Sequence, residues 1–155
     1  MRKLFIAAAA SLLSIAAQAS DLSWDAGNDV GGASVIYGEP ETDNIWFNAN
    51  CIASAKVVQV MITIDSKLLP KRVAPASESY TLVTKVGTEA FRLIGRVEPD
   101  ELSSAHSFIV LITPDHPFLQ KLARDSKSNI TYGKIVIPLD TKSASGVARV
   151  IKSCG

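Results

Sequence analysis

The sequence contains few of the residue types on which catalytic and metal sites depend. Its 155 residues include two histidines, two cysteines and two methionines. His106 and His116 are ten positions apart, and neither belongs to a His-Glu-x-x-His zinc motif. A G-x-S-x-G nucleophile elbow and a P-loop are also absent. The sequence therefore gives no support for a zinc enzyme, a hydrolase with that elbow or a P-loop nucleotide hydrolase, and we expect no metal and no cofactor.

The sequence also lacks a large excess of one charge. Its 16 Lys and Arg residues against 15 Asp and Glu residues give a net charge of +1. Removal of the first 19 residues takes Arg2 and Lys3 away, so that 14 basic residues remain against 15 acidic ones, a net charge of −1. Proteins that coat nucleic acid carry a cationic excess, so we expect no nucleic-acid partner.

A long apolar run occurs only at the N-terminus. Arg2 and Lys3 precede the apolar residues 4–17, and the small-x-small site Ala17-Gln18-Ala19 follows, which are the three parts of an export signal. A membrane anchor is the alternative, but these 14 residues make about 21 Å of helix, against a hydrocarbon layer of about 30 Å. We predict a signal peptide at residues 1–19 with cleavage after Ala19. The product is then one β-rich domain at residues 20–155, periplasmic or secreted, without a transmembrane segment.

Two cysteines remain after the predicted cleavage, and each lies on an apolar face. Cys51 shares one face of a predicted strand with Phe47, and Cys154 continues a helical stripe with Val147 and Val150. A redox pair or a pair of metal ligands is the alternative, but the sequence has no C-x-x-C and no histidine near either cysteine. Because an exported chain meets an oxidising compartment, we predict a structural disulfide between Cys51 and Cys154.

Alternating apolar and polar residues predict short strands through most of the sequence. The Gly87-Thr88 pair suits a two-residue hairpin turn with Val86 opposite Glu89. This register puts Leu82, Thr84, Phe91 and Leu93 on one face and Thr81, Lys85, Arg92 and Ile94 on the other. The predicted strands are residues 33–37, 45–51, 57–64, 80–86, 90–97, 108–112 and 129–139, the last being one strand or a pair of short strands.

Helical patterns occur only late in the sequence. We expect Asp115 to cap a helix with Pro117 in its first turn, and a terminal helix to begin near Ser143. The buried side of the first helix is expected to be Phe118, Leu119, Leu122 and Ala123. The fold class is therefore mainly β (α+β): an antiparallel sheet of six to eight strands, curled into a small barrel or sandwich, with two short helices near the C-terminus.

The distribution of charge suggests a binding surface. Residues 21–43 contain six acidic and no basic residues, whereas residues 56–152 contain 14 basic and nine acidic residues. One interpretation is internal compensation, with the acidic segment lying over a basic sheet. The other is a mixed apolar and cationic surface for an acidic partner or an anionic envelope component. The candidate contact residues are Trp46, Leu69, Lys71, Arg72, Arg92 and Arg96.

The sequence favours an exported, non-enzymatic binding protein whose partner is a protein or an envelope component. It would act as an inhibitor or immunity-type protein, or as an accessory subunit of an envelope assembly. One alternative is a small hydrolase that uses His106 or His116 with a nearby carboxylate such as Asp115. A second alternative is a lipid or small-molecule carrier, which requires the sheet to enclose a cavity.

Overall fold

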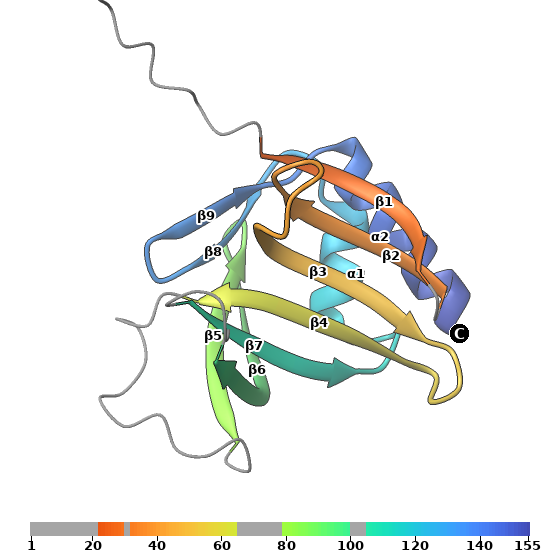
Figure 1. Ribbon diagram of the computed structural model, residues 1–155, viewed down its shortest axis with the longest axis horizontal. Helices are drawn as coiled ribbons and strands as arrows, with labels where there is room; N and C mark the ends of the chain where they lie inside the picture. The colour runs from red at the N-terminus through yellow and green to blue at the C-terminus, as the bar shows by residue number, and fades with distance from the viewer. Residues whose placement is uncertain (1–21, 30–31, 65–78, 100–104) are drawn as a thin grey trace, which may run out of the picture.

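Nine strands and two helices make up the described part of the chain (Figure 1). The computed structural model describes residues 22–29, 32–64, 79–99 and 105–155. The strands are β1 (Ser23–Asp29), β2 (Gly32–Gly38), β3 (Ile45–Ile52), β4 (Val57–Ile64), β5 (Tyr80–Val86), β6 (Glu89–Pro99), β7 (His106–Ile112), β8 (Asn129–Tyr132) and β9 (Ile135–Pro138). The helices are α1 (Pro117–Arg124) and α2 (Thr141–Cys154).

The strands form one curled antiparallel sheet in the order β1-β2-β3-β4-β7-β6-β5-β8-β9. Strand β6 joins the two halves of this sheet, because its first part pairs with β5 and its last part pairs with β7. Gly95 lies between the two parts, where a Cβ atom would collide with the Ile109 carbonyl oxygen. The glycine therefore permits the close approach at which the sheet turns its corner. The mainly β fold is confirmed.

Side-chain hydrogen bonds hold the curl across the sheet. Trp24 Nε1 in β1 donates to the Pro138 carbonyl oxygen in β9 at 2.6 Å, so the first and last strands of the sheet approach each other. The Tyr132 hydroxyl in β8 donates to the Thr63 carbonyl oxygen in β4 at 2.9 Å. Burial raises the pKa of Tyr132, which keeps the hydroxyl protonated as a donor.

Helix α2 packs inside the curve of the sheet against β1 to β4 (Figure 1). It begins at Thr141, two residues before the predicted start, because Asp140 caps it: the Asp140 carboxylate accepts from the Ser143 amide at 2.7 Å. On its outer side, Arg149 Nη2 donates to the Gly27 carbonyl oxygen of β1 at 2.9 Å. The buried residues of α2 are Ser143, Gly146, Val147, Val150 and Cys154.

Helix α1 shows that the predicted capping residue was wrong by one position. His116, not Asp115, is the N-cap, and its Nδ1 accepts from the Phe118 amide at 3.2 Å. Pro117 occupies the first turn as predicted. Phe118, Leu119 and Leu122 are buried and Ala123 packs against the core, so the predicted buried side of the helix is confirmed.

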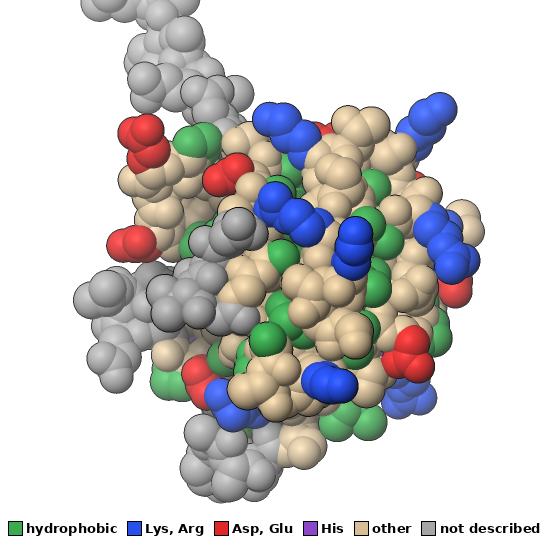
Figure 2. Space-filling model, turned by 90° about the vertical axis from the view of Figure 1, so that its right-hand side faces the viewer, with side chains coloured by type: hydrophobic (Ala, Val, Ile, Leu, Met, Phe, Trp, Pro, Cys, Tyr) green, Lys and Arg blue, Asp and Glu red, His purple; other side chains and the backbone are tan. Residues whose placement is uncertain are grey.

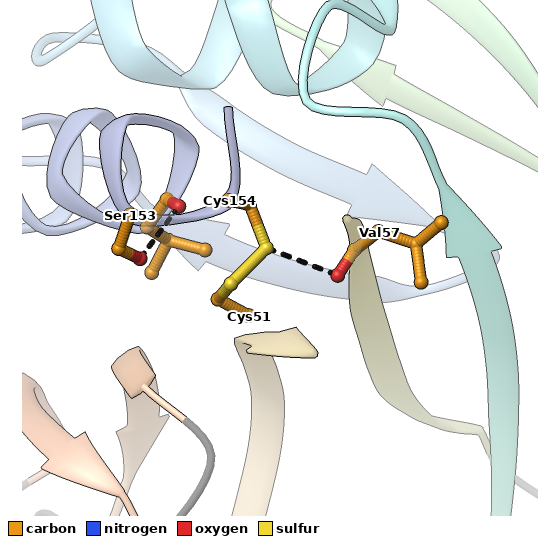
Figure 3. Close-up of a disulfide and its surroundings, with 5 residues drawn as sticks. Cys51, Val57, Ser153 and Cys154 are labelled. Atoms are coloured by element: carbon orange, nitrogen blue, oxygen red, sulfur yellow. Dashed lines mark hydrogen bonds between the residues drawn. A yellow bond between two sulfur atoms is a disulfide. The ribbon is translucent and has the colours of Figure 1, made fainter. Parts of the chain in front are cut away.

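A disulfide joins the end of α2 to β3 (Figure 3). Cys51 and Cys154 are the predicted pair, they are separated by 103 positions in sequence, and both side chains are buried. The Val57 carbonyl oxygen at the start of β4 lies 3.1 Å from Cys154 Sγ. The bridge therefore fixes the last turn of α2 over the β3–β4 hairpin.

The strand count exceeds the predicted six to eight, since the described residues contain nine. The additional strand is β1, whose glycine and aspartate residues have low β-propensity. Its Trp24 is only 4% exposed and packs against Tyr37 and Phe47, with ring centroids 5.1 and 5.5 Å apart. Tertiary packing therefore outweighs local propensity in β1.

Candidate partner-binding surface

The β5–β6 hairpin presents an outward face that combines apolar and cationic side chains. Val86 pairs with Glu89, so the predicted hairpin register is confirmed. We call the outward residues the hairpin face: Thr81, Val83, Lys85, Arg92 and Ile94, all of which are exposed. Val83 is 53% exposed and Ile94 is 67% exposed. Because Val83 pairs with Arg92 and Thr81 pairs with Ile94, the two apolar side chains are diagonal neighbours on this face.

The opposite side of the hairpin is fixed in the core. Thr84 and Leu93 are buried, and the Thr84 hydroxyl donates to the Thr131 carbonyl oxygen at 3.2 Å. Phe91 meets Phe118 of α1 in an edge-on ring contact, with centroids 5.5 Å apart. Side chains that alternate along a strand point to opposite faces, so this anchoring holds the hairpin face outward.

Arg96 lies beyond the bend at Gly95 and has its own counter-charge. Its Nε is 2.6 Å from Glu98 Oε1, and both side chains are about half exposed, at 52% and 42%. Arg92 has no ion pair among the described residues. Of Arg92 and Arg96, only Arg92 therefore belongs to the hairpin face without an ion pair among the described residues.

Trp46 lies in β3, on the far side of β4 and β7 from β6. It is half-buried and packs against the core, so it is not the fully exposed aromatic anchor that the sequence allowed. Among the described residues, its buried indole Nε1 has no hydrogen-bond partner, and neither does Oδ1 of Asn48, two residues further along β3. The candidates Leu69, Lys71 and Arg72 lie outside the described residues.

Cations also cover other parts of the surface. The two helices contain five basic residues and no acidic ones: Lys121, Arg124, Lys142, Arg149 and Lys152. Figure 2 shows Lys and Arg side chains spread over one face, with Asp and Glu toward its margins. Positive charge alone therefore does not distinguish the hairpin face. Its distinguishing property is that two large apolar side chains, Val83 and Ile94, are exposed beside Arg92.

The acidic segment forms no ion pair with a basic residue in the described part of the protein. Residues 22–29 and 32–43 supply β1, β2 and part of the loop after β2. The ion pairs among described residues are Arg96–Glu98 and Lys121–Asp125, and neither includes this segment. Internal compensation by an acidic segment lying over a basic sheet stays a prediction.

The histidines lie in different structural settings. His116 Nδ1 accepts the capping hydrogen bond from the Phe118 amide of α1. His106 begins β7, and its buried Nδ1 has no hydrogen-bond partner among the described residues. In the part of the chain that the structure describes, no three His, Cys, Asp or Glu side chains are grouped to hold a metal. The interior of the curled sheet is filled by aromatic and aliphatic side chains, the largest being Tyr132, Phe47, Phe108 and Phe118.

Comparison with protein-family models, with curated proteins and with solved structures gives no match. Within the described ranges, neither helix has the length and apolar character needed to cross a membrane.

Proposed function

We propose that the protein is an exported, non-enzymatic binding protein that engages an acidic partner protein through the hairpin face. The observation that carries this proposal is the exposure of Val83 and Ile94 on the same face as Lys85 and Arg92, with Val83 directly opposite Arg92. Large apolar side chains next to cations that have no ion pair within the described residues match a partner surface with an apolar centre and carboxylates around it. The hairpin is held from behind by the core, so little ordering is needed on binding.

The expected role is that of an inhibitor or immunity-type protein, or of an accessory subunit of an envelope assembly. The sequence supports export through its leader, and the buried Cys51–Cys154 bridge suits an oxidising compartment. The partner would then be a protein of the same compartment.

Ile94 offers a direct test with a matched control. A photo-crosslinking residue at position 94 should capture an acidic protein from the envelope or secreted fraction of the source cells. The same residue at position 148 should not, because Ala148 is also exposed but lies on α2, which packs against β1 to β4. The captured protein is then purified and its dissociation constant for the oxidised protein is measured.

The second stage measures the apolar and charge contributions separately. Burial of the exposed part of Ile94 contributes about 1 to 2 kcal/mol, so Ile94→Glu should weaken binding at least about tenfold. Arg92→Glu should weaken binding and reduce its dependence on salt, whereas Lys152→Glu on α2 should leave both unchanged. Equal capture at positions 94 and 148, or equal effects of Arg92→Glu and Lys152→Glu, would contradict the proposal.

A further inference from the structure

A surface pocket of about 420 Å³ lies at the β1 edge of the sheet. Strands β3, β4 and β7 separate β2, which contributes to this pocket, from β6. Its walls come from β1, from β2 and the following loop, from the start of β3 and from the first turn of α2. The lining residues are Ser23, Trp24, Asp25, Ile36, Gly38, Glu39, Pro40, Glu41, Thr42, Ile45 and Lys142.

The loop that forms the rim of the pocket is held by its own hydrogen bonds. The Glu39 amide donates to the Asn44 carbonyl oxygen at 3.1 Å, and the Thr42 hydroxyl donates to the Glu39 carbonyl oxygen at 3.0 Å. Gly38 is required at the base, since a Cβ there would lie 2.5 Å from the Asn44 carbonyl oxygen. Glu41 adopts a left-handed backbone conformation, with φ of 62°. The rim is therefore formed before any ligand arrives.

The chemistry of the pocket is anionic on one side and apolar on the other. Asp25, Glu39 and Glu41 supply three carboxylates against one ammonium group, that of Lys142. None of these four groups has an ion pair within the described residues. Ile36, Ile45 and Pro40 supply an apolar wall.

An unsatisfied acceptor lies next to this wall. Asn48 pairs directly with Ile36 in the sheet, and both side chains are on the same face. The Asn48 Oδ1 atom is buried and has no hydrogen-bond partner in the structure. Buried polar atoms are normally paired, so this acceptor lies unsatisfied among the described residues beside the wall, although Asn48 does not itself line the pocket.

We propose that this pocket binds an ammonium or guanidinium group carried on a short apolar stem, as in a lysine or arginine side chain or a free alkyl amine. The carboxylates receive the cationic head, and the apolar wall receives the stem. Lys142 competes with the ligand, because its ammonium group lines the same cavity. The site is independent of the hairpin face and binds a ligand of the opposite charge.

The test uses two cationic probes and one neutral probe. Agmatine represents a free cation, acetyl-Gly-Lys-Gly-amide represents a side chain on a macromolecule, and acetyl-Gly-norleucyl-Gly-amide is the neutral control. Binding to the oxidised protein is followed by the NMR shift of the Trp24 indole N–H, because Trp24 lines the pocket. We expect at least one cationic probe to give a saturable shift in the millimolar range, and the neutral probe to give none.

Substitutions at four positions identify the groups responsible. Glu39→Gln and Glu41→Gln should each weaken cation binding about two- to fivefold. Lys142→Gln should strengthen it by a similar factor. Asp43→Asn should have no effect, because Asp43 is an exposed carboxylate of the same loop that does not line the pocket.

Agmatine binding alone would identify a free cation as the ligand, and peptide binding alone would identify a macromolecular side chain. The proposal is overturned if neither cation gives a saturable shift, if the norleucyl peptide binds as well as the lysyl peptide, or if Asp43→Asn weakens binding as much as Glu41→Gln. Because the hairpin variants do not touch this pocket, these results are separate from any failure of the proposed partner surface.

Discussion

Gly146 in the middle of α2 has a packing role that a substitution can measure. An alanine Cβ at this position would lie 2.6 Å from Val35 Cγ2 and 3.3 Å from the Ala26 Cβ. Alanine is favoured over glycine inside a helix by about 1 kcal/mol. Overpacking of a close contact costs about 1 to 3 kcal/mol. We therefore expect Gly146→Ala to lower the free energy of unfolding by up to about 2 kcal/mol, although the substitution improves helix propensity.

A double-mutant cycle separates the two effects. Val35→Ala removes the nearest methyl group, so Gly146→Ala should be much less harmful in that background, with a coupling free energy of about 1 to 2 kcal/mol. The free energies come from urea unfolding of the oxidised proteins. Ala148→Gly, at an exposed position of the same helix, calibrates propensity alone and should cost about 1 kcal/mol.

Two outcomes would refute this reasoning about Gly146. One is a stabilisation of about 1 kcal/mol by Gly146→Ala in the native background, which would mean that propensity acts without a packing cost. The other is a coupling free energy with Val35→Ala close to zero.

Two further predictions concern the disulfide and the pH dependence of stability. Replacement of Cys51 and Cys154 by alanine removes the cross-link between two positions that are 103 apart in sequence. The free energy of unfolding should fall by up to about 4 to 5 kcal/mol, because the unfolded chain is no longer constrained. A loss below about 1 kcal/mol in urea unfolding would contradict this prediction. Hydrogen bonding from Ser128, together with the Lys127 amide and the Lys121 ammonium, lowers the pKa of Asp125 to about 2. Because the folded pKa lies below the unfolded value, this stabilisation is present above about pH 4 and is lost as the pH falls toward 2. Asp125→Asn should flatten that part of the curve of unfolding free energy against pH, and an unchanged slope would contradict the prediction.

The β5–β6 hairpin and the α1 buried stripe could be predicted because their signals are local. The turn at Gly87 and the alternation of the flanking strands specify the register within a few residues. The same local reasoning placed the cap of α1 at Asp115 because aspartate is the commoner capping residue. The structure uses the imidazole of the next residue, His116, instead.

Features that depend on distant contacts were not visible in the sequence. Strand β1 is fixed by the Trp24–Pro138 hydrogen bond, between residues 114 positions apart. The pocket likewise depends on where the first turn of α2 lies, because Lys142 is far in sequence from Glu39 and Glu41. The sequence shows that residues 21–43 are acidic, but only the fold shows the cavity beside Glu39 and Glu41.

The curl of the sheet also affects how the protein can associate with copies of itself. A flat sheet has edges that face in opposite directions, so strands from other chains can add at both ends and a fibre can grow. Here the edge strands β1 and β9 approach each other, and the Trp24–Pro138 hydrogen bond joins them. Arg149 also donates a hydrogen bond to the Gly27 carbonyl oxygen of β1. A strand that added at the corner where β1 meets β9 would have to break the Trp24–Pro138 hydrogen bond. The curl therefore removes that corner from the free edges of the sheet.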